Sequence, residues 1–327
     1  MNKKLLDGIL SFFLFLLSTF IGLGTAEVLL RAKNSRMDNY DIEIWKYAKD
    51  LKIKSENSVL DYEHLKNKKG TYQNINFRIN ERGLRGDKLR NSINRRILFL
   101  GGSITLGWGV DEEDVVTNRI EKMFLNIGEN VEVLNGGMLN YNTQRYVTRF
   151  FEKLKDLRPT DIVINYFLRD AEDLKPTKPN YLLRNSQLAV TVWTAFKRTI
   201  NYREQNSIEE YYGSIYKKNN IGFQTMEKNL KKLADYAKSN DIRIYIVMIP
   251  DISDLIDYKF DYIHEMIREI AKANNYIFID SLPKFRGRSF ESLYAMPGDP
   301  HPNSEGHNII AETAFPELLN ANEQKIK

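Results

Sequence analysis

From Arg96 onward the sequence alternates short apolar runs with longer amphipathic stretches, and this alternation restricts the possible folds more than any other feature. The apolar runs have the length and composition of buried strands and occupy residues 96–100, 131–135, 161–167, 242–250 and 276–280. The amphipathic stretches have helical spacing and occupy residues 112–127, 144–157, 223–240, 260–275 and 305–320. Strands separated by helices predict an α/β domain whose mainly parallel sheet is covered on both faces.

The predicted domain extends over residues 95–322, and residues 171–220 interrupt its rhythm as an insertion or lid. Ligands of an open parallel sheet bind at the carboxyl ends of the strands. The candidate site segments are therefore the connections that follow the strands, at residues 101–109, 136–143, 168–173, 250–254 and 282–307.

The first of these connections reads GGSITLGWG and follows the strand RILFL directly. It lacks the glycine spacing of a dinucleotide-binding turn, and Trp108 stands where a Walker loop needs its lysine. The α/β-hydrolase elbow requires a glycine two residues after its serine. In this sequence Thr105 stands at that position. Two roles remain open for Ser103 on this stretch alone, a nucleophile at a strand end or the cap of the next helix.

A serine nucleophile needs a base and an acid that orients the base. Of the four histidines, His64 lies in a polar region and His264 lies inside an amphipathic helix. His301 follows the last strand, and Asp299 precedes it by two residues. The Asp299 carboxylate is thus expected to hold one imidazole nitrogen of His301 while the other nitrogen faces Ser103.

Other roles compete for these residues. Asp299 also suits a turn, and a place in the first turn of the last helix is favoured for His307. A metal site built from Asp299, His301 and His307 is conceivable, but no further cluster of ligand residues supports it. The sequence therefore predicts neither a metal nor a cofactor.

The N-terminal residues 1–36 differ from the rest of the chain. Residues 8–26 form an uncharged stretch. The stretch is long enough for a helix to span a bilayer, and it is longer than the apolar core of most signal peptides. We expect a membrane anchor, with a signal peptide cleaved after Ala26 as the alternative. Lys3 and Lys4 favour a cytoplasmic N-terminus, so the bulk of the chain is expected outside the cytoplasm, in the periplasm or at the cell surface, or secreted if cleaved.

Between the anchor and the domain, residues 37–94 are polar and are expected to form a stalk and a lead-in hairpin. The stretch NINFRINERGLRGDK alternates like a strand and then turns at a glycine. The net charge of +5 is modest and forms no long basic stripe, so no nucleic-acid partner is expected. The absence of cysteine excludes disulfides and thiol catalysis.

Four motifs, taken in order and spacing, resemble those of the SGNH (GDSL-like) hydrolase family, and the stretch FRINERGLRG is similar to the lead-in of its membrane-anchored bacterial members. The motifs are LGGSITLG, LNGGMLNYNTQ, NYFLRDAED and DPHPNSEGH. The resemblance implies a flavodoxin-like three-layer α/β/α sandwich, with Ser103 as nucleophile, His301 as base and Asp299 as its partner. It also implies an oxyanion site or substrate contacts at Asn140, Arg169 and Asp170.

The sequence departs from the family pattern at several of these positions. Gly102 replaces the usual aspartate before the serine, Asn140 replaces a glycine, and Arg169 replaces the asparagine that donates to the oxyanion. The Asp-x-His spacing is one residue shorter than the common one. A guanidinium can donate to an oxyanion, but Arg169 can also bind an acidic group of the substrate or pair with Asp170.

These features predict a serine esterase that removes O-acyl groups from a cell-surface or exported glycan. The alternatives are an O-acyltransferase on the same fold, a catalytically weakened glycan-binding or assembly component, and a lipid-ester hydrolase. The apolar segment YLLRNSQLAVTVWTAF, residues 181–196, gives the lipid alternative its support, although an ordinary buried helix is the favoured interpretation of that segment.

Overall fold

The computed structural model describes residues 3–35, 39–91, 93–178, 180–203, 207–296 and 299–323. The chain divides into two compact units. One unit comprises Met1–Lys49 together with Lys178–Gln205, and the other comprises Asp50–Thr177 together with Asn206–Lys327. The middle of the interrupting segment thus groups with the N-terminal helices, and the larger unit contains the sheet.

Five parallel strands form the central sheet of the larger unit, in the order β6-β5-β7-β8-β9. They are β5 (Arg95–Gly101), β6 (Val131–Asn135), β7 (Asp161–Phe167), β8 (Arg243–Ile249) and β9 (Ile277–Asp280). This order, 2-1-3-4-5 in chain numbering, is the flavodoxin-like arrangement. The predicted fold class is confirmed.

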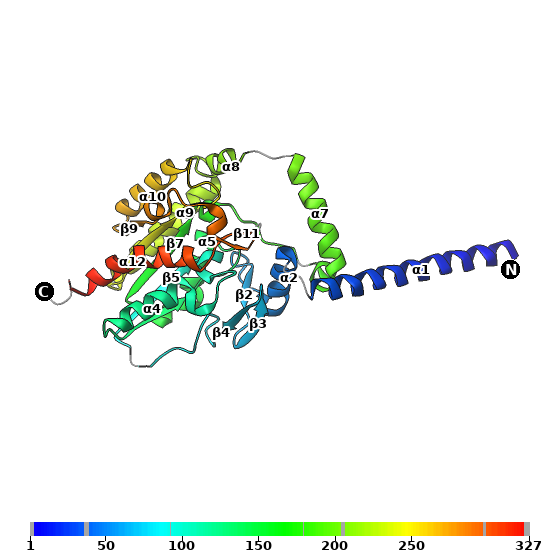
Figure 1. Ribbon diagram of the computed structural model, residues 1–327, viewed down its shortest axis with the longest axis horizontal. Helices are drawn as coiled ribbons and strands as arrows, with labels where there is room; N and C mark the ends of the chain where they lie inside the picture. Colours follow the sequence, from blue (N-terminus) through cyan, green and yellow to red (C-terminus); the bar gives the residue numbers. More distant parts are fainter. Residues whose placement is uncertain are drawn as a thin grey trace. The chain divides into compact units, whose positions relative to one another are not determined.

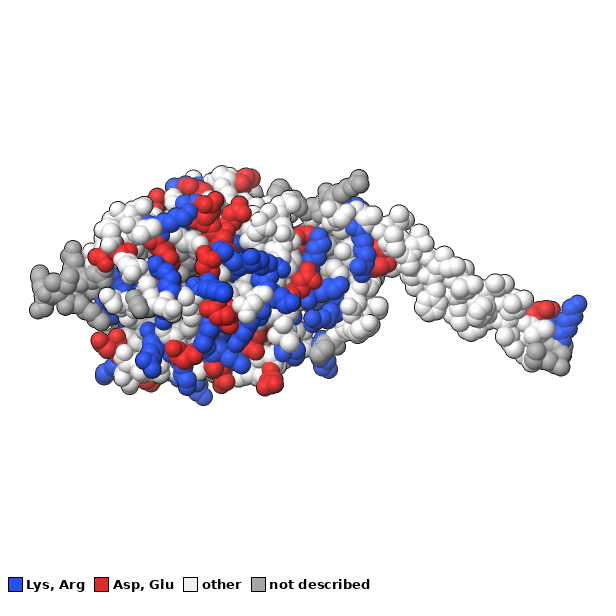
Figure 2. Space-filling model, turned by 90° about the horizontal axis from the view of Figure 1, so that it is seen from below, with Lys and Arg blue, Asp and Glu red and all other residues white. Residues whose placement is uncertain are grey.

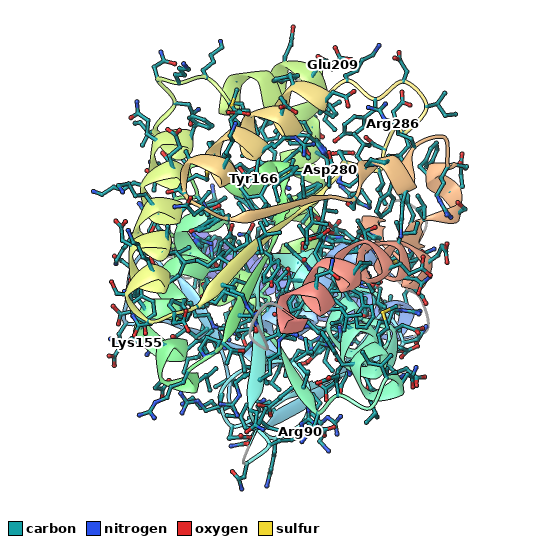
Figure 3. The ribbon with its side chains drawn as sticks, turned by 90° about the vertical axis from the view of Figure 1, so that its left-hand side faces the viewer. Arg90, Lys155, Tyr166, Glu209, Asp280 and Arg286 are labelled. Carbon is teal, nitrogen blue, oxygen red and sulfur yellow. The ribbon has the colours of Figure 1, made fainter. Side chains whose placement is uncertain are left out.

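Helices cover both faces of the sheet (Figures 1 and 3). Figure 3 shows α12 (red) on one side of the sheet and α9 (yellow-green) on the other. Helix α4 packs against α12, and α5 packs against α9. The principal helices are α4 (Val116–Asn126), α5 (Thr143–Arg149), α9 (Ile221–Ser239), α10 (Asp261–Ala273) and α12 (Ser304–Glu323), with a short α8 (Ile208–Ile215) before α9.

Two of the predicted helices are less regular than their spacing suggests. The stretch 112–127 begins as a 3₁₀ turn, Glu112–Asp114, and Val115 is extended before α4 starts. The stretch 144–157 is α5 followed by a π-helical turn, Phe150–Leu154, and a further 3₁₀ turn. Apolar spacing indicates which face is buried, but it does not distinguish these related helical geometries.

Two antiparallel hairpins precede the sheet. In the first, β1 (Lys52–Lys54) pairs with β2 (Tyr62–His64); in the second, β3 (Lys68–Tyr72) pairs with β4 (Ile75–Ile79). Gln73 and Asn74 form the two-residue turn of the second hairpin, and both have positive φ, +52° and +61°. Positive φ at both central residues is typical of the turn that suits the twist of a hairpin.

The smaller unit contains α1 (Lys3–Asn34), α6 (Tyr181–Asn185), α7 (Gln187–Arg203) and most of α2 (Tyr40–Leu51). Among the described residues, α1 is the one helix that is long and apolar enough to cross a membrane, with a mean hydropathy of 2.1 over its most apolar window. Figure 2 shows its apolar stretch as an uncharged surface that ends in charged residues near the N-terminus.

The interpretation of residues 181–196 as an ordinary buried helix is wrong. Val192 and Phe196 on α7 are 60% and 56% exposed. Besides the buried Val190, the helix makes its contacts through polar groups: Asn34 Nδ2 donates to Gln187 Oε1 over 2.9 Å, and Arg198 pairs with Asp41 over 2.6 Å. The apolar composition of this segment favoured a buried helix, but composition does not say whether other parts of the chain cover it.

His307 occupies the first turn of α12 and is fully buried, as favoured from the sequence. The Val116 amide donates to its Nδ1 over 3.2 Å, so the ring joins the start of α4 to α12. Burial, with Arg85 and Arg119 nearby, lowers the pKa of His307 to about 3. The ring is therefore neutral in the folded protein at neutral pH.

This burial predicts acid sensitivity. Between pH 6.5 and 3 the unfolded chain binds a proton at His307 that the folded chain excludes, so the free energy of unfolding falls as the pH drops through this window. Above pH 6.5 the group contributes no pH dependence. Asparagine in its place keeps an acceptor for the Val116 amide and does not titrate. When the pH is lowered from 7.5 to 5, the free energy of unfolding of His307→Asn, measured in urea, should fall by about 2 kcal/mol less than that of the wild type. Equal losses would contradict this account.

Candidate active site

Ser103 lies at the carboxyl end of β5, the strand between β6 and β7 where the strand order reverses. This position is the switch point at which ligands of such sheets bind. A short helix, α3 (Ser103–Leu106), begins at the serine, and Gly102 holds its N-cap position. The helix-cap role left open by the sequence is therefore not the role of the Ser103 side chain.

The Ser103 hydroxyl lies 2.7 Å from Nε2 of His301, and Nδ1 of His301 lies 2.5 Å from Oδ1 of Asp299. A carboxylate only accepts hydrogen bonds, so Nδ1 carries the ring proton in the neutral imidazole. Nε2 is then the acceptor, and the Ser103 hydroxyl donates to it. The arrangement is that of a serine nucleophile, a general base and an orienting acid.

The shortened Asp-x-His spacing has a structural reason. Residues Asp299–Pro302 form a strand, β11, that pairs with β10 (Tyr294–Met296). Side chains two residues apart in a strand point to the same face, so Asp299 and His301 stand side by side. The His301 amide also donates to Asp299 Oδ1 over 3.1 Å.

Gln73 is a member of this site that the sequence did not reveal. It sits in the turn of the β3–β4 hairpin, and its Nε2 donates to Asp299 Oδ2 over 3.1 Å. Asp299 is completely buried, and the bond holds the carboxylate oxygen that does not face His301. The turn residues indicated a hairpin, but no local pattern signals that its tip reaches a loop more than two hundred residues away.

The connection after β6 lies against α3. A Cβ on Gly137 would stand 2.1 Å from the Leu106 amide nitrogen, so only glycine permits this approach. Three residues later, Asn140 has a φ of +64°. That left-handed conformation favours glycine and tolerates asparagine better than most other residues. The replacement of the usual family glycine by Asn140 is therefore compatible with the same backbone path.

Arg169 and Asp170 lie in a 3₁₀ turn, Leu168–Ala171, that follows β7. The Arg169 side chain is 56% exposed, and its Nε and Nη2 donate to the two carboxylate oxygens of Glu172 over 2.6 and 3.2 Å. Its acidic partner is thus Glu172, in place of the Asp170 partner considered from the sequence. Asp170 is buried, and burial raises the pKa of its carboxyl well above the usual range. Its side chain therefore offers no exposed group for a substrate contact.

A model of GDSL-like lipases and acylhydrolases matches residues 99–309 of the chain, well over half of its length. The chain belongs to the GDSL-like lipase/acylhydrolase family. It is accordingly an ester-hydrolysing enzyme.

Several solved structures are similar to this GDSL-like hydrolase. A mutant of Axe2, an acetyl-xylooligosaccharide esterase from Geobacillus, is 15% identical, with 70% of this chain and 96% of that chain covered and a TM-score of 0.47. The esterase EstA from Pseudoalteromonas sp. is 13% identical, with 70% and 100% covered and a TM-score of 0.45. A G-D-S-L family lipolytic protein from Desulfitobacterium hafniense is 16% identical, with 68% and 98% covered and a TM-score of 0.44. No curated protein matches the sequence, so the family assignment rests on the match over residues 99–309.

In this GDSL-like hydrolase, Arg85 fixes the end of α3, the short helix that begins at Ser103. Its buried guanidinium donates to the carbonyl oxygens of Leu106, Gly107 and Val110 over 2.8, 2.6 and 2.8 Å. The same guanidinium stacks over the Phe77 ring at 4.0 Å. The family-like lead-in FRINERGLRG, which contains Arg85, thus supports the segment that follows Ser103.

The remaining histidines are structural. His264 Nδ1 contacts Asp280 at 2.9 Å and its Nε2 contacts the Tyr258 hydroxyl at 2.7 Å, which satisfies both ring nitrogens in the core. His64 is buried beside the carbonyl of Gly83. In the part of the chain that the structure describes, no three histidine or acidic side chains are placed to hold a metal ion.

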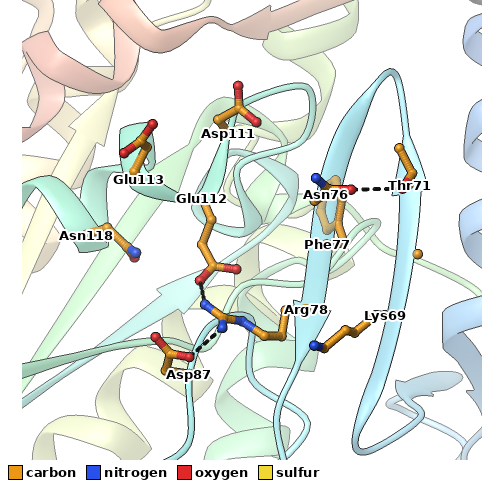
Figure 4. A pocket seen from close by; sticks show the side chains of 11 residues that line it. Lys69, Thr71, Asn76, Phe77, Arg78, Asp87, Asp111, Glu112, Glu113 and Asn118 are labelled. Atoms are coloured by element: carbon orange, nitrogen blue, oxygen red, sulfur yellow. Dashed lines mark hydrogen bonds and ion pairs between the residues drawn. The ribbon is translucent and has the colours of Figure 1, made fainter.

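A pocket of about 770 Å³ lies beside the same hairpin that carries Gln73 (Figure 4). It is lined by β3, β4 and the start of α4, and Arg78 crosses it to reach Asp87 and Glu112 over 2.6 and 2.5 Å. Its lining residues are mostly polar: Lys69, Gly70, Thr71, Asn76, Phe77, Arg78, Asp87, Asp111, Glu112, Glu113 and Asn118.

Gly102 gives a test of how tightly the nucleophile turn is packed. A Cβ at this position would stand 2.9 Å from the Tyr141 carbonyl oxygen, which belongs to the backbone and cannot move away cheaply. We expect Gly102→Ala to lower the free energy of unfolding by about 1–3 kcal/mol and to reduce ester hydrolysis, measured by thermal unfolding and turnover of a chromogenic acetyl ester. Gly213→Ala is the control, because a Cβ there meets nothing nearer than 3.9 Å. An unchanged melting temperature for Gly102→Ala would refute the close packing.

Gln73 gives a test of Asp299 positioning. Gln73→Leu removes the donor to Asp299 Oδ2, so the carboxylate loses one of its fixed hydrogen bonds. We expect kcat to fall roughly tenfold with little change in KM, because the bond orients His301 without touching substrate. Gln224→Leu on α9 is the matched control, because it removes only an exposed hydrogen bond to the carbonyl of Lys218 and should leave kcat unchanged. A pure rise in KM for Gln73→Leu would argue against this role.

Proposed function

We propose that the enzyme is a serine esterase that removes O-acyl groups from a cell-surface or exported glycan, with Ser103, His301 and Asp299 as its catalytic residues. The observation that carries the proposal is the continuous hydrogen-bonded chain from the Ser103 hydroxyl through His301 to the buried Asp299. The contact between Ser103 and His301 has the length of an ordinary hydrogen bond, and an Nδ1 proton directed at the Asp299 carboxylate leaves Nε2 as the acceptor for the hydroxyl.

The geometry defines the proposed steps. Ser103 Oγ attacks the ester carbonyl while its proton passes to His301 Nε2, and Asp299 stabilises the imidazolium that forms. His301 then gives the proton to the leaving alcohol, which leaves an acyl-enzyme. A water that His301 deprotonates attacks the acyl group and releases the acid and free Ser103. No cofactor enters these steps.

The backbone amides of Ser103 and Asn140 are the proposed oxyanion donors, together with Arg169. The close approach of the Tyr141 carbonyl to Gly102 supports this, because it brings the residue after Asn140 next to the residue before Ser103. Arg169 can add positive charge near the developing oxyanion. Its Glu172 partner holds the guanidinium at one orientation in the structure described here.

The glycan part of the proposal rests on two features. The pocket beside the Gln73 hairpin offers amide, carboxylate and ammonium side chains, which suit the hydroxyl groups of a sugar. The apolar helix α1 has the length and composition of a membrane anchor, which would keep the enzyme close to exported polymers. We propose that α1 spans the membrane and that the rest of the chain lies outside the cytoplasm.

A covalent probe tests the catalytic assignment. A fluorophosphonate should label the wild type, and Ser103→Ala should abolish labelling and lower kcat on the order of 10⁴-fold or more. Asp299→Asn should also lower kcat by roughly 10⁴-fold, because the amide favours the wrong imidazole tautomer. Labelling of a properly folded Ser103→Ala variant would refute the assignment. An unlabelled wild type that still binds an acylated glycan would favour the non-catalytic binding alternative.

A further inference from the structure

Helix α7 presents an apolar face to solvent. Its exposed apolar residues fall on one side at about 100° per residue, and they are Val192, Trp193, Phe196 and Ile200, exposed by 60%, 45%, 56% and 41%. The rings of Trp193 and Phe196 lie 6.1 Å apart, so the aromatic part of the face is continuous. An exposed cluster of large apolar side chains marks a surface that another apolar phase covers.

The opposite side of α7 is polar and faces its neighbours in the smaller unit. Gln187 accepts a hydrogen bond from Asn34 on α1, and Arg198 pairs with Asp41 on α2. Helices of globular proteins normally bury their apolar side and expose their polar side. Among the apolar residues of α7 whose burial the structure describes, only Val190 is buried, and the larger ones lie on the side that faces away from the neighbouring helices.

The start of α7 is fixed at the point where the apolar stretch of α1 ends. Glu27, the first charged residue after residues 8–26, accepts hydrogen bonds from the Ser186 hydroxyl and from the amides of Gln187 and Leu188 over 2.8, 2.9 and 2.8 Å. Arg31 on α1 donates to the carbonyl of Asn185 over 2.8 Å. These bonds cap the first turn of α7 and hold it at the level where a spanning α1 would leave the bilayer core.

Figure 1 shows α7 (green) leaving the end of α1 (blue) steeply, so that the two helices do not run alongside each other. A helix that meets a spanning helix in this way at the bilayer surface extends along the membrane plane. Trp193 and Phe196 on the apolar side, with the Lys197 ammonium over the Trp193 ring, are the kinds of side chain that interfacial helices use.

We infer that α7 lies in the headgroup region of the bilayer that α1 spans, with Val192, Trp193, Phe196 and Ile200 inserted among the lipids. The inference rests on the proposed membrane anchor and is independent of the esterase chemistry. A lipid surface is favoured over a protein partner, because α7 starts where the apolar stretch of α1 ends. The apolar face of α7 therefore extends the apolar surface of α1 at an angle to the axis of α1.

The absence of cysteine allows single labelling sites to be introduced without background. The full-length protein is reconstituted in phosphatidylcholine and phosphatidylglycerol vesicles with an environment-sensitive NBD label at Phe196→Cys, Thr191→Cys or Leu14→Cys. Thr191 is exposed and lies about 140° around α7 from Phe196 at about 100° per residue. Leu14 lies within α1. Quenching by lipids that carry a nitroxide on the acyl chain is then measured, with circular dichroism as the check on folding.

Strong quenching at position 196, weak quenching at 191 and strong quenching at 14 would support the inference. Quenching at 14 without quenching at 196 would overturn it and leave the anchor standing. A blue-shifted but unquenched label at 196 would also overturn it, since the face would then be covered by protein, either a second copy or the hydrolase unit. No quenching at position 14 would refute the anchor and the inference together. None of these outcomes depends on esterase activity.

Discussion

The hydrogen bond between Ser103 and His301 is the contact on which the site depends, and the sheet topology makes it difficult to achieve. Ser103 follows β5, whereas His301 follows β9, and β7 and β8 lie between these strands. Three strand spacings amount to roughly 14 Å, so the chain after β9 must return across the sheet edge to deliver the imidazole. It does so through α11 (Leu282–Phe285), a 3₁₀ turn and the β10–β11 ribbon.

That return is held by backbone hydrogen bonds as well as by the contacts of Asp299 and His301. The Asn303 amide donates to Leu293 O over 2.7 Å and its side chain to Ser292 O over 2.8 Å, which closes the ribbon before α12 begins. On the opposite side, Arg85 holds the carbonyl oxygens that follow Ser103, and Gln73 holds Asp299. Both supporting residues come from the segment before the sheet, so the lead-in region contributes directly to preorganisation of the site.

The sequence predicted the features that local pattern encodes. Strand and helix positions followed from apolar spacing, and the parallel order followed from their alternation. The pairing of Asp299 and His301 was expected from residue type and position, and the extended backbone of β11 explains why one intervening residue suffices. Gln73 and Arg85 escaped notice because their roles depend on which loops meet in space. The exposure of α7 was mispredicted because an apolar composition suggests burial without identifying what covers the helix.

Arg169 is the point at which this enzyme departs most from its family pattern, and its surroundings restrict what it can do. An asparagine donor would be neutral and short, whereas the guanidinium is long and carries a charge. Glu172 binds two of its nitrogens, and the Tyr211 hydroxyl donates to the same carboxylate. Glu172 therefore limits both the reach and the net charge of the arginine. In the proposed mechanism an oxyanion would compete with this carboxylate for the guanidinium, so stabilisation by Arg169 would be smaller than that by an unpaired cation. An acidic or bulky substrate that displaces Glu172 would face the full positive charge of the Arg169 guanidinium. The pair therefore makes the charge at this position adjustable. In the proposed mechanism the departure from asparagine would thus couple oxyanion stabilisation to substrate binding, whereas a fixed amide donor would keep the two separate.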